Sequence, residues 1–69
     1  MSIAERIRSL RLGKGVSQAE MAEKLEISQA LLCQIERGSK APSLPVAINI
    51  ARILGVTLND LVEEDRKVG

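Results

Sequence analysis

The side chains best suited to recognition chemistry in this chain are two glutamines, Gln29 and Gln34, because one glutamine amide both donates and accepts hydrogen bonds. Both lie in a short segment that follows Ser28, where Leu32 and Ile35 recur at helical spacing on the inner side. That spacing leaves four residues pointing outward, namely Gln29, Ala30, Cys33 and Gln34. This segment is therefore the first candidate for a binding surface.

Catalytic and metal-binding chemistry have little support in the residue types. The chain has no histidine and one cysteine, so it lacks the usual zinc ligands and any Ser-His or Cys-His nucleophile pair. It also has no glycine-rich phosphate loop. We expect a binding protein that is not an enzyme and that needs no metal and no cofactor.

Two short amphipathic helices within residues 17–38 must position these side chains. Ser17 and Glu20 have the spacing of a capping box, which gives the first helix a defined start. Its apolar face is formed by Met21, Ala22 and Leu25. Only Glu26 to Ser28 separate the two helices, and Gly38 supplies the stop. Two helices joined by so short a turn are typical of a helix-turn-helix.

Caps and breakers indicate three further helices around this pair. One runs from Ser2 or Ile3 to about Leu12. We expect its buried stripe to consist of Ile3, Ile7 and Leu10. Another begins after Ser43, and the last begins at Thr57. The sequence thus predicts an all-α fold with five helices and a central helix-turn-helix.

The order of these elements resembles the phage-repressor and Cro-like helix-turn-helix family, also called the xenobiotic-response-element family. The resemblance runs from Ile3 to Leu61 and is carried by the motifs IRSLR, VSQAEMA, LEIS, QIERG, APSL and ARILGVTLNDL. It implies a five-helix, lambda-repressor-like bundle whose third helix enters the major groove of DNA. Glu26 departs from the pattern, because the family usually has glycine where the turn needs a left-handed backbone. We expect either local strain there or a slightly different turn.

The resemblance assigns base reading to Gln29, Ala30 and Gln34. A glutamine amide suits N6 and N7 of adenine, and Ala30 or Leu31 can touch a thymine methyl group. Leu31 stands where the family more often has a polar residue, so a role in binding a protein partner or in the core stays open. Cys33 is either a small filler on this face or a thiol whose oxidation would disturb phosphate contacts.

Phosphate contacts are expected from Gln18, Arg37 and Lys40, with simple solvation as the alternative. Gln18 begins its helix, where the positive end of the helix dipole favours an anion. Arg37 and Lys40 belong to the segment that follows the outward face. The resemblance also implies a semi-buried ion pair between Arg11 and Glu36, which join the first and third helices.

The net charge of +1 is low for a DNA-binding domain, so the positive charge must be local. We expect one positive face formed by Arg8, Arg11, Lys14, Arg37 and Lys40. Acidic residues gather in a tail that contains Asp60, Glu63, Glu64 and Asp65. Such an asymmetry still leaves one face with enough local positive charge to bind DNA.

The helix after Ser43 carries more apolar surface than one small core needs. One of its stripes consists of Leu44, Ala47, Ile48, Ala51 and Leu54, and the other consists of Val46, Ile50 and Ile53. The last helix can fold back over the second stripe, but we favour a homodimer built on residues 43–65. Its interface is predicted to contain Val46, Ile50, Ile53, Leu58, Leu61 and Val62.

Composition bounds the remaining possibilities. Residues 1–69 have the size of a single domain, and 45% apolar with 28% charged residues is the balance of a soluble globular chain. Without aromatic residues there is no stacking platform for unpaired bases, which favours duplex DNA over RNA. A lone cysteine, no leader and no membrane-length apolar run favour the cytoplasm.

These observations favour a sequence-specific transcriptional regulator of bacterial or phage type that acts as a homodimer on a palindromic operator. A repressor or controller needs only to occlude polymerase, whereas an activator needs a polymerase-contacting patch, for which residues 60–65 are the candidate. The alternative is a protein-interaction module such as an antitoxin, which would bind through Leu31 and the second apolar stripe. The near-neutral charge is its main support.

Overall fold

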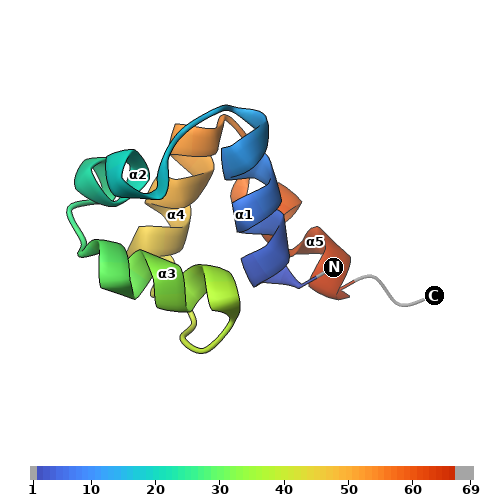
Figure 1. The fold of residues 1–69 in the computed structure, drawn as a ribbon. Coiled ribbons are helices and arrows are strands. Elements are labelled where there is room, and N and C mark those ends of the chain that lie inside the picture. Colours follow the sequence, from blue (N-terminus) through green and yellow to red (C-terminus); the bar gives the residue numbers. More distant parts are fainter. Residues whose placement is uncertain (1, 67–69) are drawn as a thin grey trace.

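The five expected helices are present in the computed structural model, which describes the backbone of residues 2–66 and the side chains of residues 2–62 (Figure 1). They are α1 (Ile3–Gly13), α2 (Gln18–Leu25), α3 (Gln29–Arg37), α4 (Leu44–Leu54) and α5 (Leu58–Arg66). The described part of the chain has no strand, so the all-α prediction is confirmed. None of these helices is both long and apolar enough to cross a bilayer.

Serine hydroxyls begin the first four helices, each accepting the backbone N–H three residues on. Ser17 and Glu20 form the expected capping box, with 3.0 Å between the Ser17 hydroxyl and the Glu20 amide. Ser2 and Glu5 form a second box, which the same spacing in the sequence signals and which our sequence reasoning missed. Local hydrogen bonds therefore define where the helices begin.

The core lies between α1, α2, α3 and α4, with α5 packed on α1 and α4 (Figure 1). Its fully buried side chains are Ile7, Met21, Leu32, Ile35, Ile50, Leu54 and Leu61. On α1 the buried stripe consists of Ala4, Ile7 and Arg11, whereas Ile3 and Leu10 are only half-buried. The stripe differs from the predicted one because α1 packs against three helices, α3, α4 and α5.

The predicted dimer interface is wrong for Ile50 and Leu61. The two residues are 0% and 1% exposed within a single chain, because they belong to the core cluster to which all five helices contribute. The other predicted interface residues are half-buried against the same core, namely Val46, Ile53, Leu58 and Val62. The apolar side chains that α4 leaves most exposed are instead Leu44 and Ile48, from the stripe expected to be buried.

The turn between α2 and α3 keeps its left-handed residue although that residue is a glutamate. Glu26 has φ of 60° and ψ of 39°, close to the conformation of Gly38 and Gly55, which end α3 and α4. Of the two expectations for Glu26, local strain is therefore the correct one. A side chain in this region costs about 1–2 kcal/mol relative to a right-handed backbone.

Candidate nucleic-acid interface

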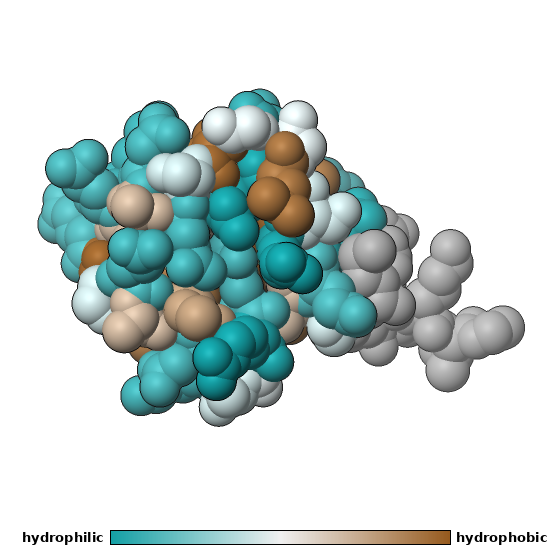
Figure 2. Space-filling view, in the orientation of Figure 1, coloured by the Kyte–Doolittle hydropathy of each residue, from teal (hydrophilic) through white to brown (hydrophobic). Residues whose placement is uncertain are grey.

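One long side of α3 is left open by its packing against α1 and α2. Gln29, Ala30 and Gln34 stand exposed on it, and Cys33 is half-buried. Leu31 is also half-buried and packs against the core, so it is not the exposed leucine that a protein partner would need. Figure 2 shows that the surface over α3 is mostly hydrophilic, with a few weakly apolar side chains. This surface is polar, and the small apolar side chain of Ala30 is exposed on it.

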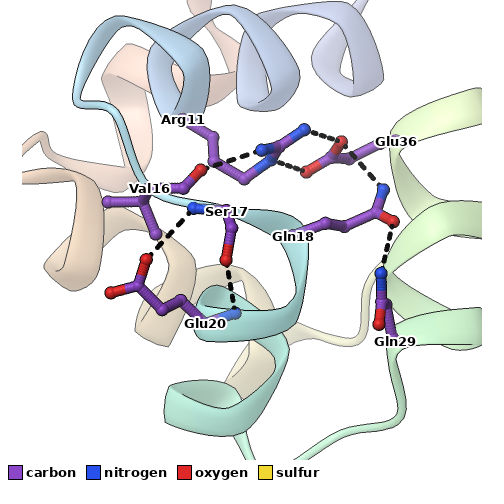
Figure 3. A network of polar contacts seen from close by, with 7 residues as sticks. All are labelled: Arg11, Val16, Ser17, Gln18, Glu20, Gln29 and Glu36. Atoms are coloured by element: carbon purple, nitrogen blue, oxygen red, sulfur yellow. Dashed lines mark hydrogen bonds and ion pairs between the residues drawn. The ribbon is translucent and has the colours of Figure 1, made fainter.

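The expected ion pair between Arg11 and Glu36 is present and fixes α3 to α1 (Figure 3). Arg11 Nε donates to Glu36 Oε2 at 2.6 Å, and Arg11 Nη2 donates to Glu36 Oε1 at 3.0 Å. A further donor, Arg11 Nη1, reaches the Val16 carbonyl oxygen at 2.9 Å. Because the two side chains are only 8% and 2% exposed, each charge depends on the other for compensation.

Two glutamines extend this pair into a chain of hydrogen bonds that ends at the outward face of α3 (Figure 3). Gln18 Nε2 donates to Glu36 Oε1 at 3.3 Å, and Gln29 Nε2 donates to Gln18 Oε1 at 3.4 Å. This link between Gln18 and Gln29 was not expected from the sequence. The only available signal was that each glutamine is the first residue of its helix, which brings the two together once α2 and α3 cross.

The loop after α3 is held by the last turn of that helix. The backbone amides of Ser39 and Lys40 donate to the Gln34 carbonyl oxygen at 3.0 and 3.3 Å. Arg37 is exposed, and its Nη1 approaches Cys33 Sγ at 3.9 Å. The side chain of Lys40 is exposed as well. Two cations therefore stand near the carboxyl end of α3.

The expected positive face is smaller in the structure. Arg11 does not belong to it, because it is buried and neutralised by Glu36. Lys14 lies beside Gly55 at the end of α4 instead of near α3. The exposed cations around α3 are Arg8, Arg37 and Lys40. In the expected acidic tail, the side chains of Glu63, Glu64 and Asp65 lie outside the described residues.

Sequence comparisons identify related proteins. A family model described as helix-turn-helix matches residues 7–61. The chain is 36% identical over 63 residues to the HTH-type transcriptional regulator DdrOP3 of Deinococcus deserti, covering 91% of this chain and 49% of that protein. It is 32% identical over 65 residues to the immunity repressor protein of Bacillus phage phi105, covering 94% and 45%. The chain thus spans about half the length of these relatives.

The fold also matches that of solved structures. SinR, a master regulator for biofilm formation crystallised in complex with DNA, superposes with a TM-score of 0.80 and is 33% identical. The match covers 87% of this chain and 97% of that one. Together with the family match over residues 7–61, this establishes that the chain belongs to the Cro/C1-type helix-turn-helix family.

Proposed function

We propose that this chain is a sequence-specific transcriptional regulator of the repressor type, which inserts α3 into the major groove of duplex DNA. The observation that carries the proposal is the exposed Gln29 amide at the start of α3, which donates a hydrogen bond to Gln18 Oε1 at 3.4 Å. Gln18 is held in turn by the buried carboxylate of Glu36. A recognition side chain that is already oriented loses less conformational entropy when it binds.

The hydrogen-bonding groups left on Gln29 match one base. Gln29 Nε2 donates one of its two hydrogens to Gln18 Oε1. Its second hydrogen and Oε1 have no partner among the described side chains. A donor and an acceptor side by side complement N7 and N6 of adenine in the major groove. We therefore assign Gln29 to adenine, Ala30 to a neighbouring thymine methyl group, and Gln34 to a base further along the same face.

Backbone phosphates would be bound beside this reading face. Gln18 opens α2, where the positive end of the helix meets the anion. Arg37, at the end of α3, lines the same surface hollow as Gln18. Lys40 lies in the following loop, which is held by the two backbone amides that donate to the Gln34 carbonyl oxygen. Such contacts fix the register on the duplex and carry no sequence information.

We further propose that two copies bind a palindromic operator. Ile53 on α4 and Val62 on α5 keep part of their surface exposed, unlike Ile50 and Leu61. A two-fold pair joined there would present two α3 helices to half-sites one helical turn apart, about 34–36 Å. A dimer bound across a promoter occludes polymerase without a further domain.

The assignment of Gln29 is tested by comparing two variants on two duplexes. The operator is first selected from a random duplex pool, and affinities are then measured at fixed salt for that operator and a scrambled duplex. Gln29→Ala should cost about 1–3 kcal/mol on the operator and little on the scrambled duplex. Lys40→Ala should weaken both equally. An equal loss on both duplexes for Gln29→Ala would make it a backbone contact only.

The dimer is tested by sedimentation of three variants. Ile53→Asp and Val62→Lys place a charge on the half-exposed apolar side chains and should shift the mass to that of a monomer. Asn49→Asp, on the exposed side of α4, is the matched control and should stay dimeric. Circular dichroism checks that each variant is folded. Folded variants of unchanged mass would rule out this interface.

A role in binding a protein, as in an antitoxin, is favoured by a separate observation. Leu44 and Ile48 stand 63% and 37% exposed one turn apart on α4. Two exposed aliphatic side chains at this spacing suit a partner helix. Titration with mixed duplex DNA at low salt separates the two functions, because a DNA-binding chain saturates with an affinity that falls as salt rises.

A further inference from the structure

The hydrogen bonds from Glu36 through Gln18 to Gln29 run in one direction only (Figure 3). As the partner of Arg11 in an ion pair, the Glu36 carboxylate accepts hydrogen bonds and cannot donate one. Gln18 must therefore turn its amide nitrogen toward Glu36, and it donates to Glu36 Oε1 at 3.3 Å. Gln18 Oε1 is then left to accept from Gln29 Nε2. A buried carboxylate thus determines which end of the Gln29 amide faces Gln18.

This direction limits the hydrogen bonds that Gln29 can offer to a base. One hydrogen of its Nε2 is given to Gln18, so one N–H donor and the acceptor Oε1 remain. Turning the Gln29 amide over would bring its Oε1 against Gln18 Oε1, where neither oxygen has a hydrogen to give. Turning Gln18 over as well would bring its Oε1 against the Glu36 carboxylate. An amide that keeps its bond to Gln18 therefore cannot replace its acceptor by a second donor.

Gln34, which is exposed on the same face of α3, differs in this respect. Its side-chain amide has no hydrogen-bond partner among the described residues. It can present its oxygen or its nitrogen to a base with equal ease. The restriction therefore applies to Gln29 and makes Gln34 the natural comparison.

The acceptor of Gln29 matters because of the hydrogens that adenine carries. In a duplex, one hydrogen of adenine N6 pairs with thymine and the other faces the major groove beside N7. Gln29 Oε1 would accept the second hydrogen while its free N–H donates to N7. A methyl group on N6 takes the place of the hydrogen that faces the groove, because the remaining hydrogen is needed for pairing. Gln29 Oε1 would then meet a methyl group and lose its donor.

We propose that Gln29 excludes N6-methyladenine, so that binding depends on the methylation state of one adenine in the site that α3 reads. This inference rests on the proposed function and adds regulation to it. A DNA adenine N6-methyltransferase whose site overlaps the operator would weaken the complex without any change in base sequence. Loss of a bidentate base contact corresponds to a roughly 5- to 150-fold lower affinity.

The test places N6-methyladenine at one adenine of the selected operator at a time and measures affinities at fixed salt. At one adenine the methyl group should weaken the unmodified protein by roughly 5- to 150-fold. Gln29→Ala should bind that methylated operator and the unmethylated one equally, to within about twofold. Gln34→Ala is the matched control on the same face. It should bind more weakly overall but keep the full methyl effect at that adenine.

Two results would overturn the exclusion while leaving the proposed function in place. One is that no adenine responds to methylation. The other is that every adenine that responds does so equally in Gln29→Ala and in the unmodified protein. In both cases the unmodified protein would still prefer the operator to the scrambled duplex. If the unmodified protein binds these two duplexes equally, the proposed function and the exclusion are both wrong.

Discussion

Two arginines of α1 tie that helix to different partners, and their surroundings differ sharply. Arg11 is buried and makes a two-bond ion pair with Glu36 of α3. Arg6 is half-buried, and its Nε donates to the Asp60 carbonyl oxygen of α5 at 3.0 Å. The same residue type thus holds the proposed recognition helix through charges removed from water and holds α5 through a bond near the surface.

The burial of each arginine determines how firmly it holds its partner helix. A buried charge that loses its partner stays uncompensated, whereas groups near the surface exchange a lost partner for water. At the start of α5, Asp60 and Thr57 cap each other through two exposed hydrogen bonds of 3.0 and 3.1 Å. We therefore expect the orientation of α3 to be set rigidly and the start of α5 to tolerate substitution.

The largest effect is expected from breaking the buried pair. Glu36→Gln leaves the Arg11 charge unpaired and should lower the free energy of unfolding by about 3–5 kcal/mol, measured by urea denaturation. Replacing both partners, with Arg11→Met and Glu36→Leu, should recover much of that loss. If Asp60→Asn at the exposed cluster costs as much as Glu36→Gln, the contrast between the two regions does not hold.

A smaller effect tests whether α3 is positioned by the side-chain network or by the backbone turn before it. Glu26→Gly removes the strain at φ of 60° and should raise the free energy of unfolding by about 1 kcal/mol. The preference for operator over scrambled duplex should stay the same, because the bonds among Gln18, Gln29 and Glu36 are untouched. A change in that preference would mean that the strained turn sets the angle of α3.

The smallest effect concerns acid sensitivity at α5. The hydrogen bond that the Thr57 backbone amide donates to the Asp60 carboxylate lowers the pKa of that carboxyl most, followed by the interaction with the Thr57 side chain and by the Arg6 charge. A lowered pKa in the folded state means that this stabilisation is present above the unfolded value, about 3.9, and is lost as pH falls through the folded value. Asp60→Asn should therefore flatten the decline in unfolding free energy below about pH 4. An unchanged decline would contradict this assignment.

The helices themselves were predictable because their boundaries depend on neighbours in sequence. Ser17, Ser28 and Ser43 cap amides three residues away, and Gly38 ends α3 in a left-handed conformation that glycine tolerates best. The pair of Arg11 and Glu36 was also expected, through the family resemblance. One consequence of the pair was not expected, namely that Arg11 is absent from the positive face. An arginine that neutralises a buried glutamate contributes no net charge to that face.

The sequence by itself determined five capped helices, the helix-turn-helix and the outward positions of Gln29, Ala30 and Gln34, since each follows from spacing within about one helical turn. The packing of the helices alone buries Ile50 and Leu61 in the shared core and brings the Gln29 amide within hydrogen-bond distance of Gln18. Both depend on how helices distant in the chain cross, and an apolar stripe or a glutamine amide is compatible with several partners until packing selects one.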